Sequence, residues 1–124
     1  MSAYLTPVDL RLIGWKRWLV LSVLEYQSDL LGRVVRVPQW FETDLDSVPR
    51  LPLVYLVAGE QAPASAVVHD WLLETETPWP LAAKVFREAM AVEGVATWIR
   101  ELMYAAVRAR GWRKAITDYL TRFP

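Results

Sequence analysis

The residues best suited to chemistry lie in two short segments of the chain. His69, the only histidine, is followed directly by Asp70 within a run of apolar residues that is typical of a helix. The segment Thr43–Ser47 carries hydroxyl groups and the carboxylates of Asp44 and Asp46 between prolines. An imidazole or carboxylate that is buried without a hydrogen-bond partner destabilises the fold. We therefore expect Thr43–Ser47 to contact His69 and Asp70 through side-chain hydrogen bonds.

Three kinds of chemistry fit these residues, and the first is a structural lock, in which His69 or Asp70 holds the Thr43–Ser47 loop against the helix. The second is an active site, in which His69 acts as general base and Asp44 or Asp70 orients it. Ser47 is then the nucleophile or a substrate contact. The third is a metal site with ligands from His69, Asp70 and Asp44. We favour the lock, because clusters of perturbed polar groups are often structural.

The chain contains no cysteine and a single histidine. This excludes disulfides, thiolate zinc sites, iron–sulfur clusters, cysteine nucleophiles and any site that needs two imidazoles. The carboxylates of Asp44, Asp46 and Asp70 can hold a hard cation only if they converge. We therefore predict that the protein folds without a metal or cofactor and that a chelator leaves its melting temperature unchanged. A fall of more than about 5 °C that one divalent ion reverses would contradict this prediction.

The elements that must position these residues begin with a β-hairpin over residues 15–37. β-Branched and aromatic residues predict one strand over Trp18–Tyr26 and a second over Arg33–Val37, which a proline ends. Gln27–Gly32 forms the turn between them, because its glycine can adopt positive φ. A lone hairpin is marginally stable in water, so it must pack against other elements.

Residues 38–63 contain four prolines, which exclude a long helix and favour a loop with one short helix over Leu53–Val57. Over residues 64–123 the apolar residues recur at helical spacing. The pattern predicts helices over Ala64–Leu73, Leu81–Val92 and Val95–Arg110, the last two ended by Gly94 and Gly111, and a short fourth helix over Trp112–Phe123. The sequence thus predicts an α+β fold in a single domain, residues 1–124, with an N-terminal β-hairpin or small antiparallel sheet packed on a C-terminal cluster of three to four helices.

Seven tryptophans occur in the 124 residues. Because tryptophan buries a large area with one polar group, we expect packing in or beside the core. This applies to Trp15, Trp18, Trp71, Trp79, Trp98 and Trp112. Four basic residues surround the last of them: Arg108, Arg110, Arg113 and Lys114. We interpret them as a solvated helix end, with a basic and aromatic contact patch as the alternative.

The charges balance, with 14 Lys+Arg and 14 Asp+Glu. This argues against nonspecific binding to nucleic acid, which depends on excess cations. The distribution is uneven, because residues 81–124 hold eight basic and four acidic residues. The longest apolar stretches are shorter than the ~20 residues of a membrane-spanning helix, and the N-terminus does not resemble a secretory signal. We therefore expect neither a membrane span nor binding to nucleic acid.

An ordered set of motifs extends over about residues 15–112. It consists of Val37-Pro38, Phe41, Thr43-Asp44, Ser47–Arg50, Ala66–Leu72, Val85–Met90, Met103–Val107 and Gly111. These motifs resemble the phage and prophage family called domain of unknown function 1353, and the resemblance implies a viral context and the family's fold. The family pattern differs at four positions, having glycine at Trp40, a small residue at Asp46, tyrosine at Leu73 and aspartate at Ala83. If that aspartate is a ligand or base in the family, this chain lacks it.

Three functions fit these observations. The leading hypothesis is a phage- or prophage-encoded accessory or structural protein that acts by contact with another protein, in the tail or particle. The second is a small hydrolase of cell-wall or other host material, which uses the cluster of Asp44, Ser47, His69 and Asp70. The third is an inhibitor of a host protein. The partners are then viral or host proteins, with self-association open, and the location is the virion or the host cytoplasm.

Overall fold

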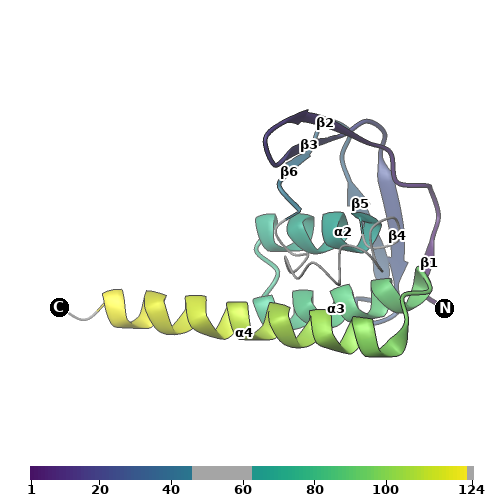
Figure 1. Ribbon diagram of the computed structural model, residues 1–124. Helices are drawn as coiled ribbons and strands as arrows, with labels where there is room; N and C mark the ends of the chain where they lie inside the picture. Colours follow the sequence, from purple (N-terminus) through teal and green to yellow (C-terminus); the bar gives the residue numbers. More distant parts are fainter. Residues whose placement is uncertain (46–62, 123–124) are drawn as a thin grey trace.

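The computed structural model describes residues 1–45 and 63–122. It has the predicted α+β arrangement, with antiparallel strands in the N-terminal part and helices in the C-terminal part (Figure 1). One sheet, in the order β1-β4-β5, consists of Ala3–Tyr4, Leu24–Ser28 and Arg33–Val37; the other, in the order β2-β3-β6, consists of Leu10–Gly14, Arg17–Val20 and Glu42–Thr43. The helices of the described part are α2 (Pro63–Glu74), α3 (Trp79–Val92) and α4 (Thr97–Thr121). The short helix predicted over Leu53–Val57 lies outside the described residues.

The predicted hairpin turn is confirmed between β4 and β5. Gly32 has φ +64° and its N–H donates a hydrogen bond to the carbonyl of Asp29 at 3.2 Å. The single strand predicted over Trp18–Tyr26 is wrong, because this segment is divided between β3 and β4, which belong to different sheets. At the division the N–H of Leu21 donates to the carbonyl of Asp9, at 2.9 Å. Strand propensity is similar on both sides of this bend, so the residue types do not reveal it.

A core forms where the β4–β5 pair packs against α2 and α3. The inward residues of the two strands, Leu24, Tyr26, Val35 and Val37, are fully buried. They pack in one cluster with Val67, Val68 and Leu72 of α2 and with Ala82, Val85 and Ala89 of α3. The helical spacing of apolar residues in the first predicted helix therefore corresponds to a buried face. A second cluster joins α2, α3 and α4 through Ala66, Ala83, Phe86, Met90, Ile99, Met103 and Val107.

Glu93, at the end of α3, connects three elements. Its Oε1 accepts a hydrogen bond from the backbone N–H of Ser65 at 2.8 Å and one from the hydroxyl of Tyr4 at 3.2 Å. The first of these gives an acceptor to an N–H group of the first turn of α2, where N–H groups have no partner within the helix and a negative charge is stabilising. Burial raises the pKa of Glu93. The carboxylate thus holds β1 and the start of α2 against the end of α3.

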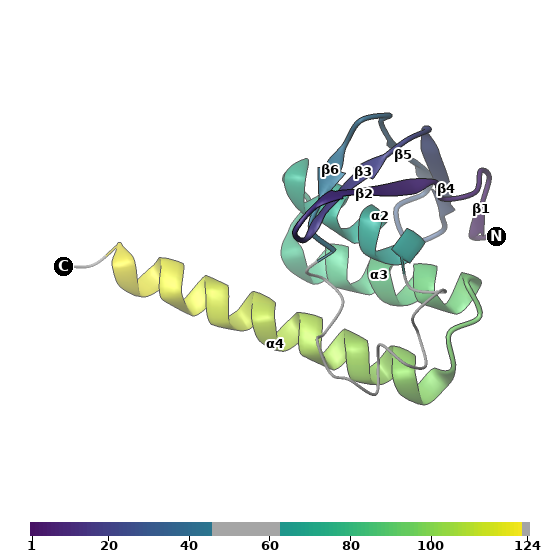
Figure 2. The ribbon, with the colours of Figure 1, turned by 45° about the horizontal axis from the view of Figure 1, so that its top comes forward.

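The last helix differs from the prediction. Gly94 ends α3 as expected, with φ +84° and its N–H donating to the carbonyl of Ala91 at 3.1 Å. Gly111, in contrast, does not end a helix, and the two helices predicted on either side of it are one continuous α4. Burial along α4 stops at Val107. The C-terminal turns of α4 project from the body of the molecule (Figures 1 and 2).

The expected packing of the tryptophans is wrong for three of them. Trp15, Trp98 and Trp112 are 86%, 56% and 55% exposed. Trp98 and Ile99 both belong to the apolar pattern of this helix. Because successive helical residues point about 100° apart, the two side chains face different directions, and it is Ile99 that is buried. The other three of the six tryptophans expected to pack, Trp18, Trp71 and Trp79, are half-buried, as expected. Among the described helices, we find none with the length and apolarity required to cross a bilayer.

Candidate functional site

The predicted contact between the two polar segments is present. The hydroxyl of Thr43 donates a hydrogen bond to Oδ2 of Asp70 and accepts one from the N–H of Leu45 at 3.1 Å. Thr43 is buried and lies opposite Trp18 in the β3–β6 ladder, which fixes its position. The bond therefore ties α2 to the end of β6.

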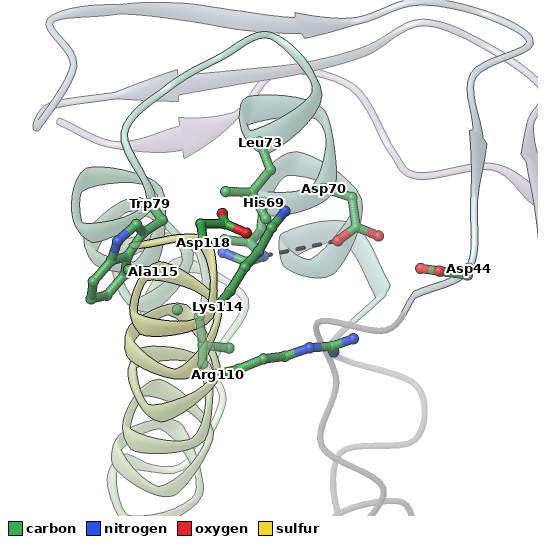
Figure 3. Close-up of a pocket in the computed structure, with 11 residues that line it drawn as sticks. Asp44, His69, Asp70, Leu73, Trp79, Arg110, Lys114, Ala115 and Asp118 are labelled. Atoms are coloured by element: carbon green, nitrogen blue, oxygen red, sulfur yellow. Dashed lines mark ion pairs between the residues drawn. The ribbon is translucent and has the colours of Figure 1, made fainter. Parts of the chain in front are cut away.

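His69 lies in the interior beside this contact. Its side chain is buried, its ring packs on Phe86 with centroids 5.1 Å apart, and its Nδ1 lies 3.9 Å from Oδ1 of Asp70 (Figure 3). Burial, followed by the positive charge of Arg110, lowers the pKa of His69 to about 4. The imidazole is therefore neutral near pH 7, and its approach to Asp70 is not an ion pair at that pH.

His69 and Asp70 border a cavity of about 520 Å³ beside α4 (Figure 3). The cavity contains charges of both signs as well as apolar surface. In Figure 3 the side chain of Arg110 extends from α4 toward the side that carries Asp70 and Asp44. The lining consists of Asp44 after β6; His69, Asp70 and Leu73 of α2; Trp79 of α3; and Val107, Arg110, Gly111, Lys114, Ala115 and Asp118 of α4.

Gly111 allows Trp79 to form part of the cavity wall. A Cβ at position 111 would lie only 2.7 Å from Cδ2 of the Trp79 ring, well inside van der Waals contact. The same ring meets Trp112 edge to face, with centroids 5.9 Å apart. The glycine therefore serves close packing between α3 and α4 and not the end of a helix.

Three of the four predicted site residues meet at the cavity. Asp44, His69 and Asp70 all line it, whereas Ser47 lies outside the described residues. Sequence reasoning missed the contributions of Arg110 and Lys114 to the cavity, because both were interpreted as part of a solvated helix end at Gly111. The signal that could have revealed them is the helical spacing of apolar residues, which continues beyond that glycine. Within residues 1–45 and 63–122, no three His, Asp or Glu side chains are grouped as metal ligands.

The geometry favours binding over proton transfer. A general base is most effective when its pKa lies near the working pH, and the pKa of His69, about 4, is far below neutrality. One oxygen of Asp70 already accepts the hydrogen bond from Thr43. The pair is therefore best suited to hold β6 on α2 and to present polar atoms to the cavity.

The chain matches the protein family described as protein of unknown function (DUF1353) over residues 18–107. Because the match covers most of the chain, the protein belongs to this family. The matched region begins in β3, includes Thr43, His69 and Asp70, and ends at Val107, the last buried residue of α4. Comparison with curated proteins and with solved structures gives no match.

Proposed function

We propose that the protein acts by binding another protein through the end of α4. We define this surface, the α4 extension, as residues 108–122. The observation that carries the proposal is its set of large exposed apolar side chains, Trp112, Ile116, Tyr119 and Leu120, which are 55%, 52%, 63% and 64% exposed. Contiguous exposed apolar surface on a small protein marks an interaction site.

The spacing of these residues supports an interface. Trp112, Ile116, Tyr119 and Leu120 stand at positions i, i+4, i+7 and i+8, which is the pattern of one apolar stripe along a helix. The extension also projects from the body, where it is accessible to a partner (Figures 1 and 2). A helix presented in this way fits a hydrophobic groove on a second protein. Tryptophan and tyrosine are also the residues most often found at the energetic centre of an interface.

Charge indicates the chemistry of the partner. The α4 extension contains five basic residues and one acidic residue, which are Arg108, Arg110, Arg113, Lys114, Arg122 and Asp118. A second copy of the extension would bring like charges together, whereas an apolar groove rimmed by Asp and Glu would meet opposite charges. We therefore infer an acidic partner protein. The resemblance to a phage and prophage family supports a pair that acts in a phage particle or tail, or in the cytoplasm of the host.

The experiment compares two exposed apolar sites on the full-length chain. Ile116→Asp places a charge in the middle of the stripe, and Trp15→Ser removes a large exposed apolar side chain from the β2–β3 turn as a control. The tagged chains are incubated with purified particles and with host lysate, and a protein captured by the wild type is identified, purified and measured for direct binding.

We expect Ile116→Asp to weaken this binding at least about tenfold, Trp15→Ser to leave it unchanged, and added salt to weaken it. Circular dichroism verifies that both variants fold. Equal binding by wild type and Ile116→Asp contradicts the proposal. A dimer of the chain itself that Ile116→Asp abolishes contradicts the acidic partner. If the captured protein is a host enzyme and its activity falls on binding, the result would favour the inhibitor hypothesis over the particle-protein hypothesis.

A small hydrolase remains the second candidate, and the cavity that brings Asp44, His69 and Asp70 together favours it. Its test is hydrolysis of bacterial cell-wall material by the purified chain. Loss of that activity in a folded His69→Gln variant would support catalysis. If the wild type shows no activity and the His69→Gln variant unfolds, the result would support a structural role of His69.

A further inference from the structure

A second cavity, of about 430 Å³, lies between α3, α4 and the β4–β5 turn. It shares no lining residue with the cavity at His69. Three of its lining side chains are cations and one is a carboxylate; the complete set is Leu30, Lys84, Arg87, Glu88, Ala91, Arg100 and Tyr104. We call this site the α3–α4 groove.

The carboxylate of the groove is already engaged by the protein. Oε1 of Glu88 accepts hydrogen bonds from the hydroxyls of Tyr26 at 2.6 Å and Ser28 at 2.8 Å. Oε2 of Glu88 accepts one from the backbone N–H of Leu30 at 3.0 Å. These bonds direct the negative charge of Glu88 toward the sheet, where it stabilises the turn.

One cation of the groove is also fixed. The guanidinium of Arg87 pairs with Oε1 of Glu101, with both Nε and Nη2 at 2.9 Å. It also lies over the ring of Tyr104, 4.8 Å from the centroid. Arg87 is therefore held in place, and its remaining N–H groups are oriented by the pair and the ring.

The other two cations have no anionic partner within residues 1–45 and 63–122. Among the described residues, neither Lys84 nor Arg100 takes part in an ion pair or a side-chain hydrogen bond, although Arg100 is half-buried. A partly desolvated guanidinium without a partner favours an anion that can supply one. The groove thus has two uncompensated positive charges beside apolar surface from Leu30, Ala91 and Tyr104.

We propose that the α3–α4 groove binds the phosphate group of a small phosphomonoester. A phosphate dianion matches the two free charges, and guanidinium groups bind its oxygens in bidentate fashion. The volume of the groove leaves room for an organic group on the apolar side. This site is independent of the α4 extension and of the cavity at His69.

The test titrates the full-length chain with inorganic phosphate and with phenyl phosphate at constant ionic strength, followed by amide NMR shifts. Both probes are expected to saturate shifts around Arg100 and Tyr104, with phenyl phosphate binding more tightly. Lys84→Gln and Arg100→Gln should each lower the affinity about tenfold, the effect of losing one charge-assisted hydrogen bond.

Arg11→Gln is the matched control, because it makes the same charge change on β2, in the other sheet and far from α3 and α4 (Figure 1). Its affinity for both probes should equal that of the wild type. The proposal is overturned if neither probe saturates, if both groove variants retain wild-type affinity, or if Arg11→Gln loses as much affinity as they do. Unchanged melting temperatures verify that the variants are folded.

Discussion

His69 makes the stability of the protein depend on pH. Its pKa is lowered from 6.5 to about 4, first by burial and then by Arg110. Between these values the unfolded chain binds a proton that the folded protein does not bind. The free energy of unfolding therefore rises with pH across this window, by about 3 kcal/mol from this group. Because His69 is the only histidine, NMR titration of its ring carbons measures this pKa directly.

The contribution of His69 is isolated by the variant His69→Gln. Glu93 acts with the opposite sign: burial raises its pKa above 4.5, so its contribution is present below that pH and is lost as the pH rises through the folded pKa. The informative quantity is therefore the difference between wild type and variant in urea denaturation at several pH values. A measured pKa near 6.5 for His69, or parallel pH profiles of the two proteins, would contradict the expectation.

Trp40 occupies a backbone conformation that suits glycine. Its φ is +74°, a value that costs an L-residue about 1–2 kcal/mol, and the resemblance implies glycine at this position. The side chain is 61% exposed, so it recovers little of that cost by burial. We predict that Trp40→Gly raises the free energy of unfolding by about 1 kcal/mol in chemical denaturation. Trp15→Gly, at an exposed tryptophan without positive φ, should give no gain, and equal effects in both variants would contradict the strain argument.

At the scale of the elements, the bond from Thr43 to Asp70 joins β6 to α2. We predict that Thr43→Val lowers the free energy of unfolding by about 1–3 kcal/mol, because a partly buried carboxylate loses one hydrogen-bond donor. Thr43→Ser keeps the hydroxyl and should lose less than half as much. Thermal denaturation of the three proteins measures the difference. A loss from Thr43→Ser as large as that from Thr43→Val, or no loss from Thr43→Val, would contradict a dominant role of the hydrogen bond.

Gly111 and Trp79 join α3 to α4 by close packing. In an ordinary helix Gly→Ala stabilises by about 1 kcal/mol, but here the new Cβ would overlap the Trp79 ring. We predict that Gly111→Ala destabilises the wild type and stabilises a Trp79→Ala background. Denaturation of the four proteins of this double-mutant cycle tests the reversal of sign. Additive effects would contradict the overlap.

Elements that depend on neighbouring residues were predictable, and so was one contact between polar residues that are distant in sequence. The α2 face, the turn at Gly32 and the end of α3 at Gly94 follow from patterns within a few positions. The contact of Thr43 with Asp70 was predictable because each polar group needed a partner. The continuity of α4 was missed because a glycine commonly ends a helix, whereas Gly111 packs against Trp79, which is far away in sequence.

On the scale of the whole molecule, positive charge is concentrated at one end. The α4 extension carries five basic residues and one acidic residue. We predict that the isolated chain is monomeric at low salt, since self-pairing of the extension would bring like charges together. Salt of about 1 M shortens the screening length to about 3 Å and should promote association of the apolar stripe. Light scattering at two salt concentrations measures this, and a dimer that is most stable at low salt would contradict the expectation.

The same turns of α4 form two surfaces. Arg110, Lys114 and Asp118 line the cavity at His69, whereas Trp112 and Ile116, from the same turns, are exposed. A continuous helix of 25 residues, about 37 Å long, moves these side chains together. A small molecule in the cavity that shifts this helix would change its affinity for a partner protein, and thermodynamic reciprocity requires the partner to change the affinity for the small molecule by the same factor. The projecting end of α4 would in this way couple an internal cavity to an external contact surface.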